Sequence, residues 1–197
     1  MKVPLRFQVT EYDCGTTSLI NALIYLFERE ELPVSFLKAI YKYTLDAEGE
    51  NGIIGAAGTS RVAVEKLSHW IKRYADNHDF NISCEILEKH EVTENRIREC
   101  LSSNGCVLAR CYQHTEHYVL ITGMDDNFAY IFDPYYLEED YYYNDSQVAI
   151  VLNQSFTHNR IVKINRLFNE SKQDFSLMEI EKREIVLINK KAQTTTV

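Results

Sequence analysis

Two residues far apart in the sequence, Cys14 and His117, have the types and surroundings that catalysis by a thiol requires. Cys14 opens a strongly apolar stretch that we expect to be helical, and Gly15 after it is expected to leave room for a substrate backbone. A thiol is a strong nucleophile only when its pKa is lowered, which a helix N-terminus and a nearby imidazolium both do. We therefore predict that Cys14 is a nucleophile and His117 its base.

Asp133 is the predicted orienting acid for His117. A three-residue hairpin loop at 125–127 would pair Met124 with Phe128 and make Asp133 the diagonal neighbour of His117 on one face of the sheet. The carboxylate can then hold one imidazole nitrogen while the other reaches the thiol. A two-residue loop would instead place Asp133 on the opposite face, so the site depends on this register.

Gln8 is the predicted side-chain donor to a developing oxyanion. It precedes Cys14 by six residues, a spacing that lets a turn bring its amide back beside the thiol. A neutral amide donor suits this role because it stabilises negative charge without pairing with the thiolate. The backbone N–H of Cys14, left without an intrahelical acceptor at a helix start, is the expected second donor. His114 is a rival base, but it lies in a polar stretch with no comparable carboxylate.

The remaining cysteines and histidines carry no predicted chemistry. Five cysteines, an odd number without a Cys-x-x-Cys pair, suggest free thiols in a reducing compartment. We predict no metal site, because the histidines show no ligand spacing, and no cofactor. The cysteines assigned to the core are Cys84, Cys100, Cys106 and Cys111, and the histidines assigned to surface or structural positions are His69, His78, His90 and His158.

Length and composition favour one domain, at 1–191, followed by a flexible tail at 192–197. With 197 residues, 45% of them hydrophobic and 12% aromatic, the chain can fill a single core. A net charge of −8 without a Lys/Arg cluster argues against nucleic acid as a partner. The sequence lacks an apolar run of membrane-spanning length and an N-terminal signal peptide, so we expect a cytoplasmic bacterial protein without membrane insertion.

Helical patterns precede strand patterns along the chain, which predicts an α+β fold with an antiparallel sheet in the C-terminal half. Asp13 or Thr10 is expected to cap the first helix. The expected helices are 14–28, 35–45, 60–74 and 94–103, and the expected strands are 107–112, 117–123, 128–132, 148–152, 160–164 and 184–189.

Two further segments can each be interpreted in two ways. The stretch 49–58 holds four of the seven glycines and lacks the phosphate-binding Gly-Lys-Ser/Thr pattern. It is either a loop bordering the cleft or a structural turn between helices. The tyrosine-rich segment 135–143 is either a peptide-binding rim or an acidic surface loop with packed rings.

The residues Gln8, Asp13-Cys14-Gly15, His117-Tyr118-Val119 and Asp133-Pro134 resemble those of the bacteriocin-processing cysteine peptidases, which remove double-glycine leader peptides. The resemblance covers residues 4–165 in order and size. It implies a papain-like fold and the roles of oxyanion donor, nucleophile, base and orienting acid, in that order. Leader peptidases of this kind usually precede a membrane exporter with an ATPase, and this sequence carries neither, so we expect a stand-alone form.

The expected function is a thiol hydrolase that cleaves a peptide or amide substrate through a thioacyl-enzyme. A thioacyl-enzyme can be resolved by water or by an amine, so an acyltransferase or a deamidase with the same triad is the first alternative. A catalytically silent peptide-binding module is the second. The motif residues specify the acyl-enzyme step and leave the acceptor open.

Overall fold

The computed structural model describes residues 1–191, and the tail predicted at 192–197 lies outside them. Four helices lie close to the expected ranges, with α3 extending four residues further than predicted, and the short α5 was not predicted. None of the helices in residues 1–191 combines the length and the hydropathy needed to cross a bilayer. They are α1 (Cys14–Leu26), α2 (Val34–Tyr43), α3 (Arg61–His78), α4 (Glu94–Ser102) and α5 (Ile164–Leu167), with short 3-10 turns at Arg29–Glu31, Lys89–Glu91 and Ile180–Lys182.

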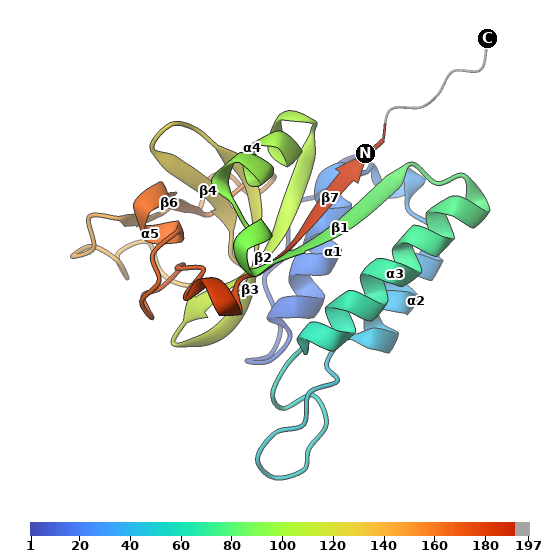
Figure 1. Cartoon of the computed structure of the whole chain (residues 1–197), viewed down its shortest axis with the longest axis horizontal. Coiled ribbons are helices and arrows are strands. Elements are labelled where there is room, and N and C mark those ends of the chain that lie inside the picture. The colour runs from blue at the N-terminus through green and yellow to red at the C-terminus, as the bar shows by residue number, and fades with distance from the viewer. Residues whose placement is uncertain (192–197) are drawn as a thin grey trace.

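Seven strands form one sheet in the order β1-β7-β2-β3-β4-β6-β5, and every neighbouring pair is antiparallel. The mixture of helices and antiparallel sheet agrees with the predicted α+β class. The first strand was not predicted, and the last strand of the chain inserts between it and β2 (Figure 1). The strands are β1 (Ile82–Glu88), β2 (Gly105–Gln113), β3 (Thr115–Met124), β4 (Phe128–Phe132), β5 (Val148–Ile150), β6 (Arg160–Lys163) and β7 (Glu184–Lys190).

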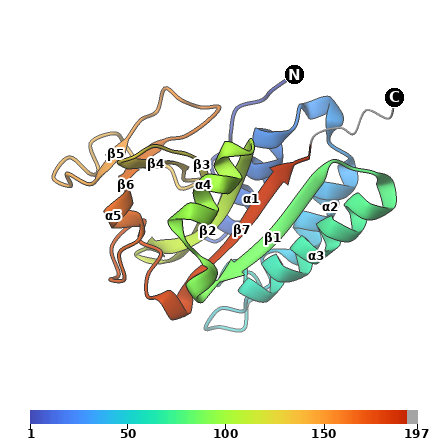
Figure 2. The same ribbon diagram turned by 45° about the horizontal axis from the view of Figure 1, so that its top comes forward.

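Helices cover both faces of the sheet, and strand alternation divides the side chains between two cores. On β2, Cys106 and Leu108 pack in the core that contains α1, α2 and α3, whereas Val107 and Ala109 pack in the core beneath α4. Figure 2 shows α4 in front of the central strands and α1 behind them. Both faces of β2 are therefore buried, which fits its near-continuous apolar sequence.

The start of α1 is not capped as predicted. Asp13 occupies the N-cap position, but its side chain makes no capping hydrogen bond to the helix backbone. Its carboxylate instead accepts the N–H groups of Val9 at 3.1 Å and Thr10 at 2.6 Å, and the hydroxyl groups of Thr10 and Thr17. Asp13 thus shapes the loop before the helix and leaves the first helical N–H groups free of a side-chain cap.

The predicted hairpin between β3 and β4 is wrong at its turn, and a bulge restores the predicted register near the site. Met124 pairs with Ala129 rather than with Phe128, so the loop is one residue longer than expected. The register then shifts between Ile121 and Gly123, after which Leu120 pairs with Phe132. Because the extra loop residue and the bulge offset each other, the strands leave the hairpin in the register that sets Asp133 diagonally across from His117.

Candidate active site

Cys14 is the first residue of α1, and its thiol is surrounded by donors. The residue is 9% exposed, and its neighbours include the His117 imidazole and the backbone N–H groups of Gly15 and Tyr118, which favour the thiolate. Burial alone would raise the pKa of the Cys14 thiol, but these donors and the charge on His117 lower it below its ordinary value. The site therefore favours a thiolate at Cys14.

His117 lies between the thiol and a buried carboxylate. Its Nε2 is 2.8 Å from Oδ1 of Asp133, which leaves Nδ1 as the nitrogen that can reach Cys14. Burial opposes the charged imidazole, but the charge of Asp133 and the hydrogen bonds to Asp133 and Cys14 outweigh it and raise the pKa of His117. The structure thus brings Cys14, His117 and Asp133 together, with His117 hydrogen-bonded to Asp133 and adjacent to the thiol.

Asp133 is fully buried, directly after β4, and four donors hold its carboxylate. Oδ1 accepts from His117 and from the Tyr135 N–H at 2.9 Å, and Oδ2 accepts from Gln113 Nε2 at 3.1 Å and Arg160 Nη2 at 3.0 Å. Burial alone would raise the pKa of Asp133, but His117, Arg160 and the Tyr135 N–H hold it below its ordinary value. The carboxylate is therefore ionised and fixed in orientation.

Gln8 reaches this region through its backbone. Its N–H donates to the Pro134 carbonyl at 2.9 Å, next to Asp133. Its side-chain Nε2 turns back to donate to the Thr10 carbonyl at 2.7 Å, and its Oε1 is buried without a hydrogen-bond partner among residues 1–191. One N–H of the amide is thus used within the loop, and Gln8 is not among the residues that line the cleft beside Cys14 and His117.

Two buried polar residues of α1 fix the elements that carry Cys14 and Gln8. Ser18, one turn after Cys14, donates from Oγ to the Tyr118 carbonyl on β3 at 2.9 Å. Asn21 accepts the N–H of Arg6 at 2.8 Å and donates to its carbonyl at 2.9 Å, two residues before Gln8. Both side chains are completely buried, so α1 holds the N-terminal segment on one side and β3 on the other.

Gly15 serves packing rather than substrate access. A Cβ at this position would lie 2.7 Å from Thr59 Cβ and 3.2 Å from the ring of Tyr118. The expectation that Gly15 leaves room for a substrate backbone is therefore wrong, because Thr59 and Tyr118 already occupy the adjacent space. Glycine allows the loop between α2 and α3 to approach the helix start.

A cleft of about 660 Å³ opens beside Cys14 and His117. The start of α1, the β2–β3 hairpin and the loop between α2 and α3 meet at this end of the molecule (Figure 1). Ala56, Ala57 and Gly58 line the cleft, so the glycine-rich segment borders it, as one of its two readings predicted. These three residues have small side chains or none, so this segment presents no bulky group to the cleft.

The other wall of the cleft is charged. Arg61 and Arg110 line it, and both form ion pairs with Glu184, which is buried beneath them. Burial raises the pKa of the Glu184 carboxyl, although both arginines and the Tyr118 hydroxyl oppose this effect. Arg110 also pairs with Glu116 at the mouth of the cleft.

The rival base His114 and the segment 135–143 lie outside this arrangement. His114 is exposed at the β2–β3 turn, and its Nε2 lies 3.2 Å from the Tyr141 hydroxyl. Tyr136 packs edge-on against Phe7 at 5.2 Å between ring centroids, and none of the residues that line the cleft comes from 135–143. This segment fits the reading of a surface loop with packed rings.

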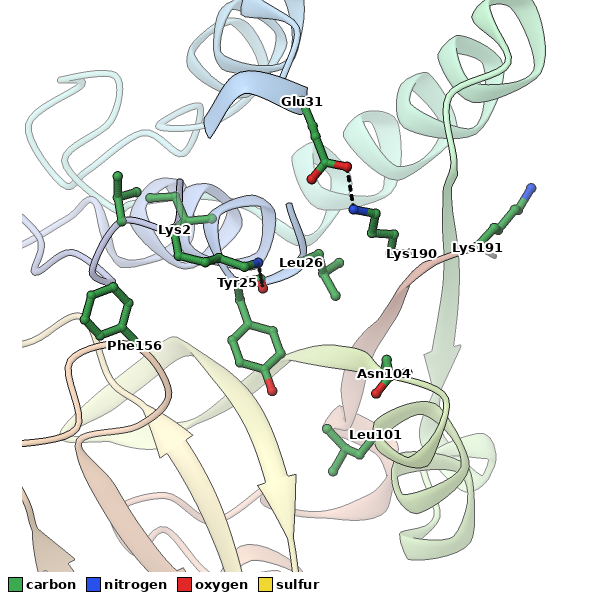
Figure 3. A pocket seen from close by; sticks show the side chains of 11 residues that line it. Lys2, Tyr25, Leu26, Glu31, Leu101, Asn104, Phe156, Lys190 and Lys191 are labelled. Atoms are coloured by element: carbon green, nitrogen blue, oxygen red, sulfur yellow. Dashed lines mark hydrogen bonds and ion pairs between the residues drawn. The ribbon is translucent and has the colours of Figure 1, made fainter. Parts of the chain in front are cut away.

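A second cavity of about 710 Å³ lies at the other end of α1 (Figure 3). Two of its three lysines are engaged: Lys2 donates to the Tyr25 carbonyl at 2.6 Å, and Lys190 pairs with Glu31 at 2.6 Å. Within residues 1–191 there is no cluster of three or more His, Cys, Asp or Glu side chains that could hold a metal ion. We assign no chemistry to this cavity.

Sequence reasoning missed Gln113, Asn159 and Arg160, the residues that hold Asp133. Asn159 accepts the Asp133 N–H at 2.7 Å and donates to its carbonyl at 2.8 Å, while Arg160 binds the carboxylate. One signal was available: Arg160 shares strand parity with the buried Val162. An arginine at an inward-facing strand position predicts a buried anionic partner.

Comparison with known proteins adds one match. The model of the Peptidase_C39 like family matches residues 1–160 of the chain, a range that includes Cys14, His117 and Asp133. A search of curated proteins found no match.

Proposed function

The chain belongs to the Peptidase_C39 like family, and from this membership and the geometry of the site we propose that it is a thiol hydrolase that cleaves a peptide or amide bond. One observation carries the proposal. Cys14 and His117 line the same cleft, the imidazole lowers the pKa of the thiol, and the Nε2 of His117 is held by the buried carboxylate of Asp133. Acyl transfer through a covalent intermediate requires a nucleophile, a base next to it and an acid that orients the base, and Cys14, His117 and Asp133 are arranged in this order.

In the proposed reaction the Cys14 thiolate attacks the carbonyl carbon of the substrate and forms a tetrahedral oxyanion. The free N–H of the Gln8 amide and the backbone N–H of Cys14 stabilise this charge. The intermediate collapses as the carbon–nitrogen bond breaks, and the His117 imidazolium gives its proton to the leaving amine. Neutral His117 then takes a proton from water, which attacks the thioester and releases the acid and the thiol.

The test combines turnover with capture of the acyl-enzyme. The full chain is incubated with a set of fluorogenic peptide amides, and mass spectrometry locates any acyl group on the protein. We expect hydrolysis and a transient adduct at Cys14, and we expect Cys14→Ala to lose both. Cys84→Ala is the matched control, because Cys84 is a half-buried thiol whose pKa is raised by burial to about 12.

Three results would change the assignment. Turnover retained in Cys14→Ala would contradict the nucleophile. A product that forms only when an amine is added would favour the acyltransferase. Saturable peptide binding with no adduct and no turnover would favour the peptide-binding module.

A further inference from the structure

Arg160 makes the closest charged contact to Asp133 apart from His117, and it is completely buried. It is the first residue of β6, where it pairs with Ile131 of β4. Its Nη2 donates to Asp133 Oδ2 at 3.0 Å and to the Tyr135 carbonyl at 2.7 Å, and its Nη1 donates to the Asn159 carbonyl at 3.1 Å. The guanidinium is therefore fixed against the carboxylate by two backbone carbonyls.

The need for hydrogen-bond donors to Asp133 does not by itself explain why a charged residue occupies position 160. Without Arg160, the Asp133 carboxylate would still accept from His117, from the Tyr135 N–H and from Gln113. Desolvating a guanidinium costs several kcal/mol, and an apolar side chain of similar volume often replaces a buried ion without loss of stability. What Arg160 adds to three existing donors is a full positive charge.

The positive charge of Arg160 matters in the reactive state of the site. When Cys14 is a thiolate, His117 an imidazolium and Asp133 a carboxylate, these three groups together carry a net charge of −1. Arg160 brings the sum to zero, which lowers the cost of burying the group.

We propose that Arg160 is a positioning residue of this site, which fixes the Asp133 carboxylate and balances the charge of the thiolate–imidazolium pair. The proposal rests on the proposed function, because it assigns a role within the same triad. Arg160 acts through Asp133 and does not need to touch the substrate.

The other titratable groups around the triad do not supply this charge. Burial raises the pKa values of Cys111, Tyr118 and Tyr142, so these three side chains are neutral at physiological pH. The acidic groups that face them would add negative charge, and Arg110 is already paired with Glu116 and Glu184. The titratable and charged groups around the site are Glu11 before α1, Arg61 at the start of α3, which is paired with Glu88 and Glu184, Cys111 and Arg110 from β2, Glu116 and Tyr118 from β3, Glu184 from β7, Tyr135 and Tyr142 after β4, and Asp174 beyond α5.

The proposal gives a signed expectation for pH dependence. A cation favours the deprotonated form of every nearby group, so removing it raises the pKa of both the Cys14 thiol and the His117 imidazole. Arg160→Met should therefore move both titrations toward alkaline pH by about one unit, which corresponds to roughly 1.4 kcal/mol of lost interaction with the positive charge. A purely structural role would lower the amount of folded protein without moving either midpoint.

The experiment follows His117 by NMR of labelled imidazole and Cys14 by the pH dependence of its alkylation. We compare the full wild-type chain with Arg160→Met and with Arg160→Lys, which keeps the charge. Arg166→Met is the control, because Arg166 is also buried and forms an ion pair at 2.8 Å with Asp145, which is partly exposed. We expect alkaline shifts in Arg160→Met and unchanged midpoints in Arg160→Lys and Arg166→Met.

The outcomes separate this proposal from the proposed function. The His117 titration needs no substrate, so it reports on Arg160 even if the protein hydrolyses no amide. Unchanged midpoints in folded Arg160→Met, or an equal shift in Arg166→Met, would overturn the role of Arg160. If Arg160→Met does not fold, the neutral but polar Arg160→Gln replaces it: alkaline shifts of both midpoints support the proposal, and unchanged midpoints in folded Arg160→Gln contradict it.

Discussion

The hydroxyl of Ser18 donates a 2.9 Å hydrogen bond to the backbone carbonyl of Tyr118 across the interface between α1 and β3. The backbone N–H of the same tyrosine favours the thiolate of Cys14, one helical turn before Ser18. The start of α1 is therefore tied to the backbone of the residue that follows His117 on β3. This arrangement sets the distance between the nucleophile and its base.

Ser18→Ala should lower both stability and activity. The change leaves the buried Tyr118 carbonyl without this donor, which costs about 1–3 kcal/mol, and it frees the start of α1 to move relative to β3. Urea unfolding and the rate of Cys14 alkylation measure the two effects. Ser68→Ala is the control, because Ser68 is also buried but donates within its own helix, to the Val64 carbonyl. An equal loss of alkylation rate in both variants would contradict the positioning role of Ser18.

Gly15→Ala should destabilise the protein by about 1–3 kcal/mol, since the added methyl group meets the Thr59 Cβ at 2.7 Å. The loop between α2 and α3 would have to move away from Cys14, so the cleft would widen. Thermal unfolding of the single variant and of Gly15→Ala/Thr59→Gly checks this directly. The double variant should recover part of the loss, and a purely additive effect would mean that the contact is not the cause.

The pH dependence of Cys14 labelling follows from the opposite shifts of the two pKa values. The lowered pKa of Cys14 and the raised pKa of His117 make the thiolate–imidazolium pair the main state between them. Alkylation of Cys14 should therefore persist well below the free-thiol pKa of about 8.5. In His117→Ala the midpoint should move to higher pH, because burial then acts without the imidazolium. The same midpoint in both proteins would contradict the ion pair.

Stability should also depend on pH through His117 and Asp133. The folded-state pKa of Asp133 is lowered, so its contribution is complete above the unfolded value of about 3.9 and is lost as the pH falls through the folded value. The folded-state pKa of His117 is raised, so its contribution is complete below about 6.5 and is lost as the pH rises through the folded value. Urea unfolding from acid to alkaline pH, for wild type and His117→Gln, measures both slopes. The alkaline slope should be reduced in the variant.

Asp133→Ala should be more destabilising than His117→Ala. Removing the carboxylate leaves Arg160 as a buried charge without its ion-pair partner, a situation that costs about 3–5 kcal/mol in other proteins. Removing His117 leaves Asp133 with three donors, Arg160 among them. Guanidinium chloride unfolding of the two variants at neutral pH gives the comparison. A smaller loss in Asp133→Ala than in His117→Ala would show that Arg160 finds another partner or reaches water.

The sequence by itself determined the features that depend on near neighbours in the chain. Apolar periodicity and the pattern around Asp13-Cys14-Gly15 located the first helix and the thiol at its start. Short β-branched and aromatic runs between turn residues located β2, β3 and β4, and with them the strand that begins near His117. These signals are local because a helical face and a strand face are each set by side chains a few residues apart.

Only the tertiary structure decided how distant segments meet. The bulge near Thr122 that restores the register, the insertion of β7 beside β2, and the contact of Arg160 with Asp133 all depend on long-range pairing. The order of the strands depends on the burial of side chains on both faces of the sheet. A buried ion pair forms only where two segments come together and exclude water from the space between them. Cys14, His117 and Asp133 could therefore each be predicted from the sequence. The positive charge of Arg160 beside Asp133 could be recognised only in the folded structure.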